Sequence, residues 1–92
     1  MDLLILMELR ERTMSGYDVM TMIYRRFGIL MGSGSVYSLL YRMEREGLIT
    51  GTWQQRRRVY ELTPDGAQVA ETSHRFYEDF EDLGILKVGG RH

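Results

Sequence analysis

The first predicted element is a helix without a polar face. After Asp2, which can cap it, residues 3–9 carry six apolar side chains in seven positions, and we expect the helix to run to about Arg12. A helix that is apolar all round needs cover on more than one side, either from its own domain or from a second subunit. This pattern is a first indication of a dimer.

A second helix is predicted from Ser15, because Ser15 and Asp18 have the spacing of a capping box. Its inner stripe follows the helical period and consists of Val19, Met20, Ile23 and Phe27. Gly28 can adopt the left-handed conformation that ends a helix, and residues 29–32 form a short linker after it. Two helices joined by so short a turn are typical of a helix-turn-helix.

The third predicted helix begins at Ser33 and ends at Gly47. Its inner face has the spacing of one side of an α-helix and consists of Val36, Leu39, Leu40 and Met43. The other face carries hydroxyls, a tyrosine and arginines, namely Ser35, Ser38, Tyr41, Arg42 and Arg45. Hydroxyls bond to base edges, and guanidinium groups bind phosphates or guanine, so this face suits a helix that enters a nucleic-acid groove.

Residues 50–54 and 58–62 predict two strands, because they are rich in Thr, Trp, Val and Tyr. The tip near residues 55–57 lacks an Asn-Gly or Asp-Gly pair, so we expect a loose turn. Thr63 and Pro64 then open a fourth helix as its cap and first residue. The order predicts an α+β, mainly α, fold: a winged helix-turn-helix of three helices and a two-stranded β wing, followed by a C-terminal helix.

The fourth helix contains a heptad seam with one polar member, formed by Val69, Ser73, Phe76, Phe80 and Leu83. Two such helices can pair across a dimer axis. We therefore predict a dimer interface from this seam and the first helix, the latter contributing Leu3, Leu6 and Met7. The expected organisation is a winged helix-turn-helix domain over 1–63, a dimerisation helix over 64–83 and a flexible, glycine-rich tail over 84–92.

Composition excludes several classes of protein. The 92 residues include no cysteine, and the two histidines, His74 and His92, lie far apart in the sequence, so neither a disulfide framework nor a metal or cofactor site is predicted. The apolar run 3–7 is too short to span a bilayer and lacks the features of a signal peptide. We expect a soluble, cytoplasmic protein with no membrane partner.

Charge is unevenly distributed along the chain, although the net charge is only -1. Residues 25–60 hold seven arginines against two glutamates, whereas residues 61–92 hold seven acids against three bases. The basic block coincides with the third helix and the wing, where a nucleic acid would dock. Local charge therefore favours nucleic-acid binding more than the overall pI near 6.1 opposes it.

Catalytic patterns are missing from the sequence. No histidine is expected near Ser33, Ser35 or Ser38, and Glu44 and Glu46 fall on different faces of one helix. The run Gly32-Ser-Gly lacks the lysine and the preceding strand of a phosphate-binding loop. We do not expect an enzyme.

A resemblance to the PadR family of transcriptional regulators covers roughly residues 3–82. It is carried by the Leu-Leu-Ile-Leu first helix, Gly16-Tyr17, Ser33-Gly-Ser-Val-Tyr37, Leu40-Tyr-Arg-Met-Glu-Arg-Glu-Gly-Leu-Ile49, Trp53, the basic wing and Tyr60-Glu-Leu-Thr-Pro-Asp-Gly66. The resemblance implies a homodimeric repressor whose third helices read a pseudo-palindromic operator, and a single C-terminal helix places the chain in the smaller branch of the family.

The chain departs from the family pattern at two serines. Ser33 and Ser38 stand where the family often has proline, so individual base contacts cannot be transferred.

Some members hold planar drugs between tryptophans of the C-terminal helix, whereas the single tryptophan here is Trp53, in the first wing strand, where we expect it to pack. Drug binding by that route is therefore not expected, and a small aromatic effector is left as an unproven partner.

The candidate DNA-binding residues come from the second helix N-terminus, the third helix and the wing. They are Ser15, Tyr17, Ser33, Ser35, Tyr37, Ser38, Tyr41, Arg42, Arg45, Arg56, Arg57 and Arg58. For Arg58, pairing with a carboxylate is the alternative to a phosphate contact. Double-stranded DNA is the expected partner, besides a second copy of the chain. The alternative is a winged-helix protein interaction module that meets an acidic partner, and a structured-RNA binder is a weaker third reading.

Overall fold

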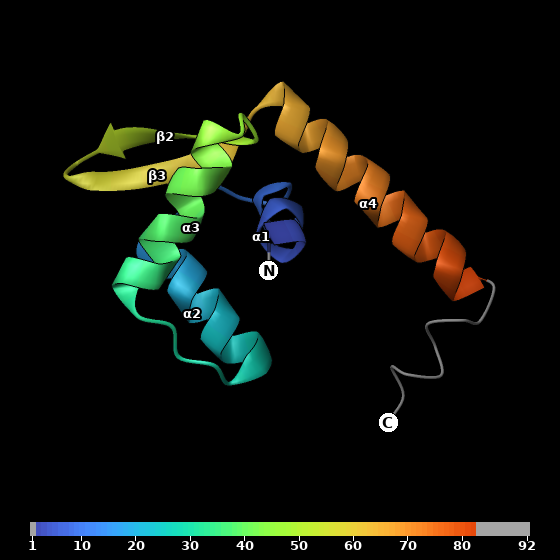
Figure 1. Ribbon diagram of the computed structural model, residues 1–92, viewed down its shortest axis with the longest axis horizontal. Coiled ribbons are helices and arrows are strands. Elements are labelled where there is room, and N and C mark those ends of the chain that lie inside the picture. Colours follow the sequence, from blue (N-terminus) through green and yellow to red (C-terminus); the bar gives the residue numbers. More distant parts are fainter. Residues whose placement is uncertain (1, 83–92) are drawn as a thin grey trace.

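A computed structural model describes residues 2–82 and the side chains of residues 2–73. Its elements are α1 (Asp2–Leu9), β1 (Met14–Ser15), α2 (Gly16–Phe27), α3 (Ser33–Arg45), β2 (Ile49–Gln54), β3 (Arg57–Leu62) and α4 (Pro64–Asp82). The β2–β3 hairpin projects on one side of α1, α2 and α3, and α4 runs away on the other (Figure 1). The predicted fold class, a winged helix-turn-helix followed by a C-terminal helix, is confirmed.

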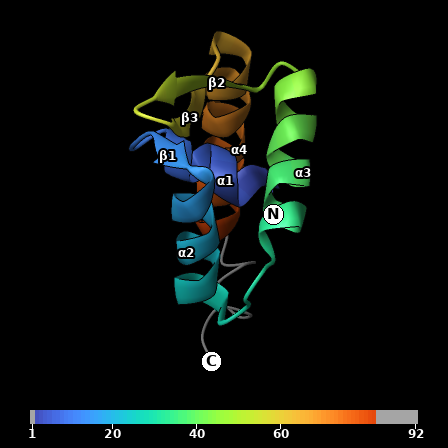
Figure 2. The same ribbon diagram turned by 90° about the vertical axis from the view of Figure 1, so that its left-hand side faces the viewer.

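Helix α1 supplies the middle of the core, as its apolar sequence predicts. Ile5, Leu6 and Leu9 are at most 6% exposed, and α1 packs against α4. Seen from the wing side, α1 lies behind α2 and α3 and in front of α4 (Figure 2). The helix ends at Leu9 rather than near Arg12, because the chain must turn to bring Met14 into the sheet.

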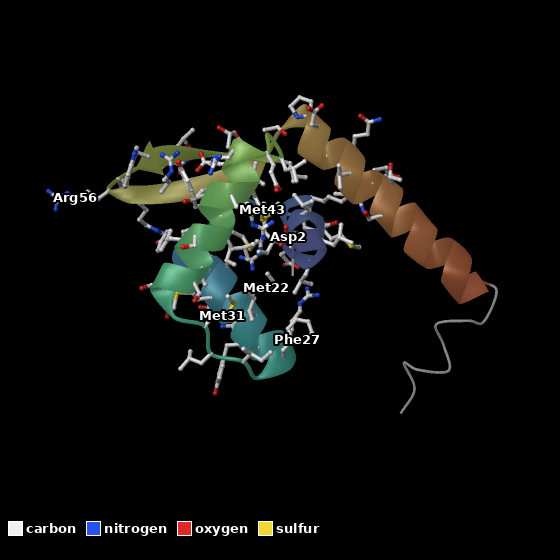
Figure 3. The ribbon with its side chains drawn as sticks, in the orientation of Figure 1. Asp2, Met22, Phe27, Met31, Met43 and Arg56 are labelled. Carbon is white, nitrogen blue, oxygen red and sulfur yellow. The ribbon has the colours of Figure 1, made fainter. Side chains whose placement is uncertain are left out.

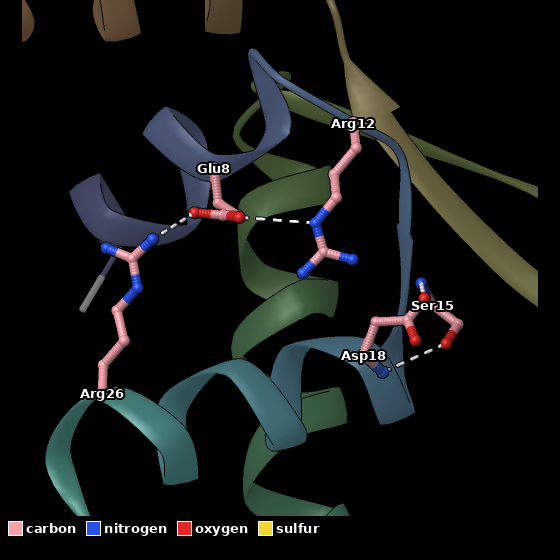
Figure 4. A network of polar contacts seen from close by, with 5 residues as sticks. All are labelled: Glu8, Arg12, Ser15, Asp18 and Arg26. Atoms are coloured by element: carbon pink, nitrogen blue, oxygen red, sulfur yellow. Dashed lines mark hydrogen bonds and ion pairs between the residues drawn. The ribbon is translucent and has the colours of Figure 1, made fainter.

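Glu8 ties α1 to α2. Its carboxylate accepts hydrogen bonds from Arg12 Nε at 3.3 Å and from Arg26 Nη2, on the last turn of α2, at 2.7 Å (Figure 4). Glu8 is only 18% exposed at its side chain, so this contact is screened less than a fully exposed ion pair. The pairing holds the C-terminal end of α2 against α1.

Helix α2 has the caps that its sequence predicts. Ser15 Oγ accepts from Asp18 N at 3.2 Å and Asp18 Oδ2 accepts from Ser15 N at 3.0 Å, which completes the capping box, and Gly28 ends the helix at φ 68°. The buried stripe is Val19, Met22 and Ile23. Phe27 was predicted to be buried, which is wrong: it is 54% exposed, because the last turn of α2 extends past the core.

Helix α3 buries Val36, Leu40 and Met43 completely, as its period predicts. Ser33 is the first helical residue, as predicted, and Gly32 occupies the cap position without a side-chain hydrogen bond. The first N–H groups of α3 therefore have no capping side chain. Gly47, with φ 79°, turns the chain from α3 into the sheet.

The sheet has three strands in the order β1-β3-β2, all antiparallel. Strand β1 was not predicted, because two residues are too few to show an alternating pattern. Met14 pairs with Tyr60 and Ser15 pairs with Val59, so the first turn of α2 starts directly from the edge of β3. This pairing places the α2 N-terminus beside the wing.

The wing turn is tight, and the prediction of a loose turn is wrong. Gln54 pairs with Arg57, which leaves Gln55 and Arg56 as a two-residue loop with φ 50° and 69°. Positive φ at both central residues is the geometry of a type I′ turn, for which Asn-Gly is the favoured sequence. Both residues here have a Cβ, so the turn is strained.

Replacing the loop by Asn-Gly, through Gln55→Asn with Arg56→Gly, should raise the free energy of unfolding by about 1 kcal/mol, because both residues tolerate positive φ. Chemical denaturation would measure the change. Gln54→Asn, in the adjacent strand position, is the control and should give no gain. Equal stability of the Asn-Gly variant and the parent chain would contradict the strained turn.

Helix α4 begins as predicted. Thr63 Oγ1 accepts from Gly66 N at 3.0 Å and Pro64 is the first helical residue. The first turn lies directly on the α3–β2 connection, where Thr63 N donates to Leu48 O at 3.1 Å and Thr63 Oγ1 donates to Gly47 O at 2.6 Å. Within the described part of the chain, no helix is long and apolar enough to cross a membrane.

Candidate nucleic-acid interface

Helix α3 turns a polar stripe toward solvent. Ser38, Tyr41 and Arg45 are exposed on the side opposite the buried Val36 and Leu40. The guanidinium carbon of Arg45 lies 5.7 Å from the centre of the Tyr41 ring, so the cation rests on the aromatic face at the edge of the stripe. Ser33 and Ser35 are exposed at the start of the helix. The predicted outer face of the helix is thus accessible.

A groove joins α3, the N-terminus of α2 and the wing. Its lining residues come from these three elements and are Ser15, Tyr17, Tyr37, Trp53, Arg56, Arg57, Arg58 and Tyr60. An adjoining hollow shares Tyr37, Arg58 and Tyr60 and extends along α3 to Tyr41 and Arg45. Eight of the twelve predicted DNA-binding residues therefore line one continuous concave face.

Close packing between Gly16 and Tyr37 builds the middle of this face. A Cβ at Gly16 would lie 2.5 Å from Cζ of Tyr37, so the tyrosine ring rests directly on the first residue of α2. Tyr37 is 46% exposed and Tyr17, the next residue of α2, is 69% exposed. The glycine thus lets one aromatic ring fill the corner between the two helices while its edge stays accessible.

Ser15 has a structural task in the described conformation. It is 5% exposed, and its Oγ accepts hydrogen bonds from Asp18 N and, at 2.9 Å, from Arg57 Nη2. Arg57 also lies 3.6 Å from the Asp18 carboxylate. The contact binds the wing, at the residue next to its tip, to the α2 N-terminus, so Ser15 positions the interface rather than presenting its hydroxyl.

The three wing arginines have different surroundings. Arg56 is exposed at the tip of the hairpin and points away from the domain (Figure 3). Arg57 reaches Ser15 and Asp18. Arg58 Nη2 donates to Glu44 Oε2 at 2.8 Å, which confirms the predicted alternative that Arg58 pairs with a carboxylate.

Trp53 does not pack at the root of the wing, contrary to our expectation. It is 69% exposed, and its ring lies 5.7 Å from the guanidinium carbon of Arg58. The alternation along β2 turns Trp53 to the open groove, where no element covers it. Arg58 lies 5.9 Å from the ring of Tyr60 as well. Burial of Tyr60 and then the charge of Glu44 raise the Tyr60 pKa above its ordinary value.

Arg42 is held away from the groove. Its Nη1 and Nη2 donate to the two carboxylate oxygens of Asp2 at 3.0 and 3.1 Å, so Arg42 forms a bidentate ion pair with the start of α1. The hydrogen bond and the charge of Asp2 raise the Arg42 pKa. The prediction that Arg42 faces the nucleic acid is not supported by this placement, because the α1 flank of α3 is a different side from the groove.

The candidate dimer residues separate into three groups. Leu3 is 49% exposed and Val69 is 37% exposed, while Met7 and Ser73 are half-buried. Leu6 is 1% exposed within the core of its own domain, so its side chain is not available to a second subunit. The side chains of Phe76 and Phe80, and all of Leu83 and the 84–92 tail, lie outside the described residues.

Three residues that line this face, Glu44, Trp53 and Tyr60, were missed by sequence reasoning as part of the site. Glu44 has the contacts that matter most here. It was judged only as a member of a carboxylate pair, whereas its contacts come from β2 and β3, which no local pattern reveals. No group of three or more metal-ligating side chains occurs among the described residues.

Comparison with known proteins agrees with this architecture. The sequence pattern of the "Transcriptional regulator PadR-like family" matches residues 5–72. A PadR family transcription regulator from Clostridium difficile R20291 is 24% identical, with a TM-score of 0.77 over 89% of this chain and 91% of that one. A PadR-like regulator from Bacillus cereus ATCC 14579 is 25% identical, with a TM-score of 0.75 over 96% and 87%.

A third solved structure contains a nucleic acid. PadR from Bacillus subtilis, solved in complex with operator DNA, is 28% identical, with a TM-score of 0.64 over 77% of this chain and 44% of that one. Among curated protein sequences, none matches the chain.

Proposed function

The chain belongs to the PadR-like family of transcriptional regulators, and from this premise we propose that it binds double-stranded DNA selectively and regulates transcription. The resemblance noted from the sequence is confirmed, and so is the expectation that the chain is not an enzyme. The observation that carries the proposal is the continuous face that joins the outer stripe of α3, the α2 N-terminus and the wing.

In this proposal α3 enters the major groove. Its solvent stripe offers a hydroxyl from Ser38, a phenol from Tyr41 and a guanidinium from Arg45, which suit base edges and guanine. Helix α3 also begins without a side-chain cap, so its first N–H groups can meet a phosphate. A helix with this set of donors can read a sequence as well as attach to the backbone.

The α2 N-terminus and the wing would bind the flanking backbone. Tyr17 is exposed at the first turn of α2, where its phenol can donate to a phosphate and the helix dipole favours an anion. Arg56, at the tip of the wing, is placed for a phosphate or an adjacent minor groove. These contacts would set the register of α3 on the duplex without reading bases.

We further propose a homodimer on a pseudo-palindromic operator, acting as a repressor in the cytoplasm. Residues 1–63 would form the DNA-binding unit, and residues 64–83 would pair the two copies. Support comes from the exposed apolar residues Leu3 and Val69 on α1 and α4, and from the heptad period of the α4 sequence. The Bacillus subtilis neighbour solved with operator DNA supports the DNA partner.

Selection of duplexes from a random pool, at near-physiological salt, tests this function. An inverted repeat with half-sites about one helical turn apart is expected, because a two-fold dimer places two recognition helices at that spacing. Enrichment of a single half-site would contradict the dimer. Absence of enrichment by the folded protein would instead favour a winged-helix protein interaction module.

Arg56→Ala should weaken binding to every duplex alike and should flatten the dependence of log affinity on log salt by about one unit per subunit, because one phosphate contact is lost. Fluorescence anisotropy at several salt concentrations measures both quantities. Arg25→Ala is the matched control, since Arg25 is an exposed arginine of α2 outside the groove. An unchanged slope for Arg56→Ala would remove the wing tip from the contacts.

A further inference from the structure

Glu44 lies where α3 meets the wing, and it contacts both wing strands. Its Oε2 accepts a hydrogen bond from Gly51 N of β2 at 3.1 Å and from Arg58 Nη2 of β3 at 2.8 Å. Because β2 is an edge strand of the sheet, the Gly51 N–H would otherwise have no strand partner on that side. One carboxylate thus connects the proposed recognition helix to both strands of the hairpin.

The Arg58 guanidinium is enclosed from several directions. Glu44 accepts a hydrogen bond from its Nη2 at 2.8 Å, and the rings of Trp53 and Tyr60 lie 5.7 and 5.9 Å from its carbon. On the Gly51 side, a Cβ would come within 2.8 Å of Arg58 Nε, so any larger residue there would require the Arg58 side chain to shift. The arginine is 30% exposed at its side chain and Glu44 is 22% exposed.

From these contacts we infer that Glu44 is a specificity-determining positioning residue, which fixes the wing relative to α3 and withholds Arg58 from DNA phosphates. The inference rests on the proposed DNA-binding function. In this arrangement Arg58 has a structural role in the interface, and the wing contacts DNA through its tip. An acid within a DNA-binding face lowers the attraction to any phosphate backbone, and non-specific binding depends on that attraction.

The length of the hairpin makes this anchor effective. Gln55 in the loop follows Gly51 by four positions, which is roughly 13 Å of extended strand. A rotation of roughly 10° at Gly51 would therefore move the tip by roughly 2 Å, enough to break a phosphate hydrogen bond. Together with the contacts of Arg57 to Ser15 and Asp18, the Glu44 contacts at Gly51 and Arg58 keep Arg56 in one register relative to α3.

Glu44→Gln tests the inference, because glutamine keeps an acceptor for the Gly51 N–H and loses the charge that holds Arg58. The ratio of operator affinity to non-specific affinity should fall by at least about tenfold. Non-specific binding should strengthen, and its salt dependence should steepen by about one unit per subunit as Arg58 reaches a phosphate. Anisotropy titrations against the selected operator and a scrambled duplex measure these changes.

Glu46→Gln is the matched control. Glu46 follows Glu44 by two residues, lies on the flank of Arg42 at 3.8 Å, and contributes the same negative charge. If Glu46→Gln changed the affinity ratio as much as Glu44→Gln, net charge alone would account for the effect and the inference would fail. Thermal melting verifies that both variants are folded.

Arg58→Gln provides an independent measurement, which also decides the matter if Glu44→Gln does not fold. It should weaken operator binding through loss of the wing anchor, while the salt slope on the scrambled duplex stays that of the parent chain. A slope flatter by about one unit per subunit would show that Arg58 contacts phosphate in the parent protein and would overturn the inference. Failure of the parent chain itself to bind any duplex would instead refute the proposed function.

Discussion

Gly66→Ala is expected to lower the free energy of unfolding by about 3 kcal/mol or more, which is a large part of the stability of a small domain. A Cβ at this position would overlap the carbonyl oxygen of Leu48, and the atoms it meets are backbone atoms that no side-chain rotation can clear. The first turn of α4 would have to lift from the α3–β2 connection.

Such a movement has two consequences. It would break the hydrogen bond from Thr63 N to Leu48 O at 3.1 Å, and it would expose Ala70, which is fully buried one turn further along α4. Because α4 covers one side of α1, the core around Ile5 would be opened as well. We expect a lower melting temperature and a less cooperative transition.

Gly34→Ala is the control for this substitution. Gly34 lies in α3 with no atom within 4 Å of an added Cβ, and alanine favours helix, so stability should stay equal or rise slightly. Circular dichroism during chemical denaturation would measure both variants. Equal stability of Gly66→Ala and the parent chain would mean that α4 does not pack on Leu48 as described.

Leu3→Glu with Val69→Glu is expected to give a monomer in solution. Operator binding should weaken by about 100-fold or more, because a monomer contacts one half-site only and loses the gain from binding both half-sites as a dimer. Both residues are exposed apolar residues, at 49% and 37%, on the two helices assigned to the dimer. Their substitution leaves the buried core of the domain unchanged.

Light scattering and titration of the selected operator would measure the two effects. Ile29→Glu with Leu30→Glu is the matched control, because these residues are exposed to a similar or greater extent but lie in the α2–α3 connection. Phe76→Glu with Phe80→Glu probes the other half of the predicted seam in the same way. If the Leu3→Glu, Val69→Glu variant had the same molecular mass in solution as the parent protein, the proposed interface would be contradicted.

Local features of the fold could be predicted because their causes lie within a few residues. The capping box of Ser15 and Asp18, the glycine stop at Gly28 and the Thr63 cap all depend on neighbours in sequence. The error at Phe27 has a global cause, since helical period identifies a face but does not say how far the core extends along it. Strand β1 escaped prediction for the related reason that two residues carry no period.

The candidate site could be predicted as a region but not in its detail. The sequence placed arginines on α3 and the wing, yet Arg42 is bound to Asp2, 40 residues away, and Arg58 to Glu44, 14 residues away. Composition does not distinguish an arginine that pairs with a distant carboxylate from an arginine that is free to bind DNA. Trp53 shows the same limit, since only the open groove beside β2 decides that its ring stays uncovered.

The sequence by itself determined the order of the helices and of the two wing strands, the caps of α2 and α4, the buried stripe of α3, and the family to which the chain belongs. These depend on short-range sterics, on backbone hydrogen bonding and on the period of apolar residues. The tertiary structure alone decided which charges pair, how tight the wing turn is, and why a side chain at Gly66 would meet the backbone of Leu48. Those features depend on atoms that distant segments bring within van der Waals or hydrogen-bond distance, and only the packed chain specifies these distances.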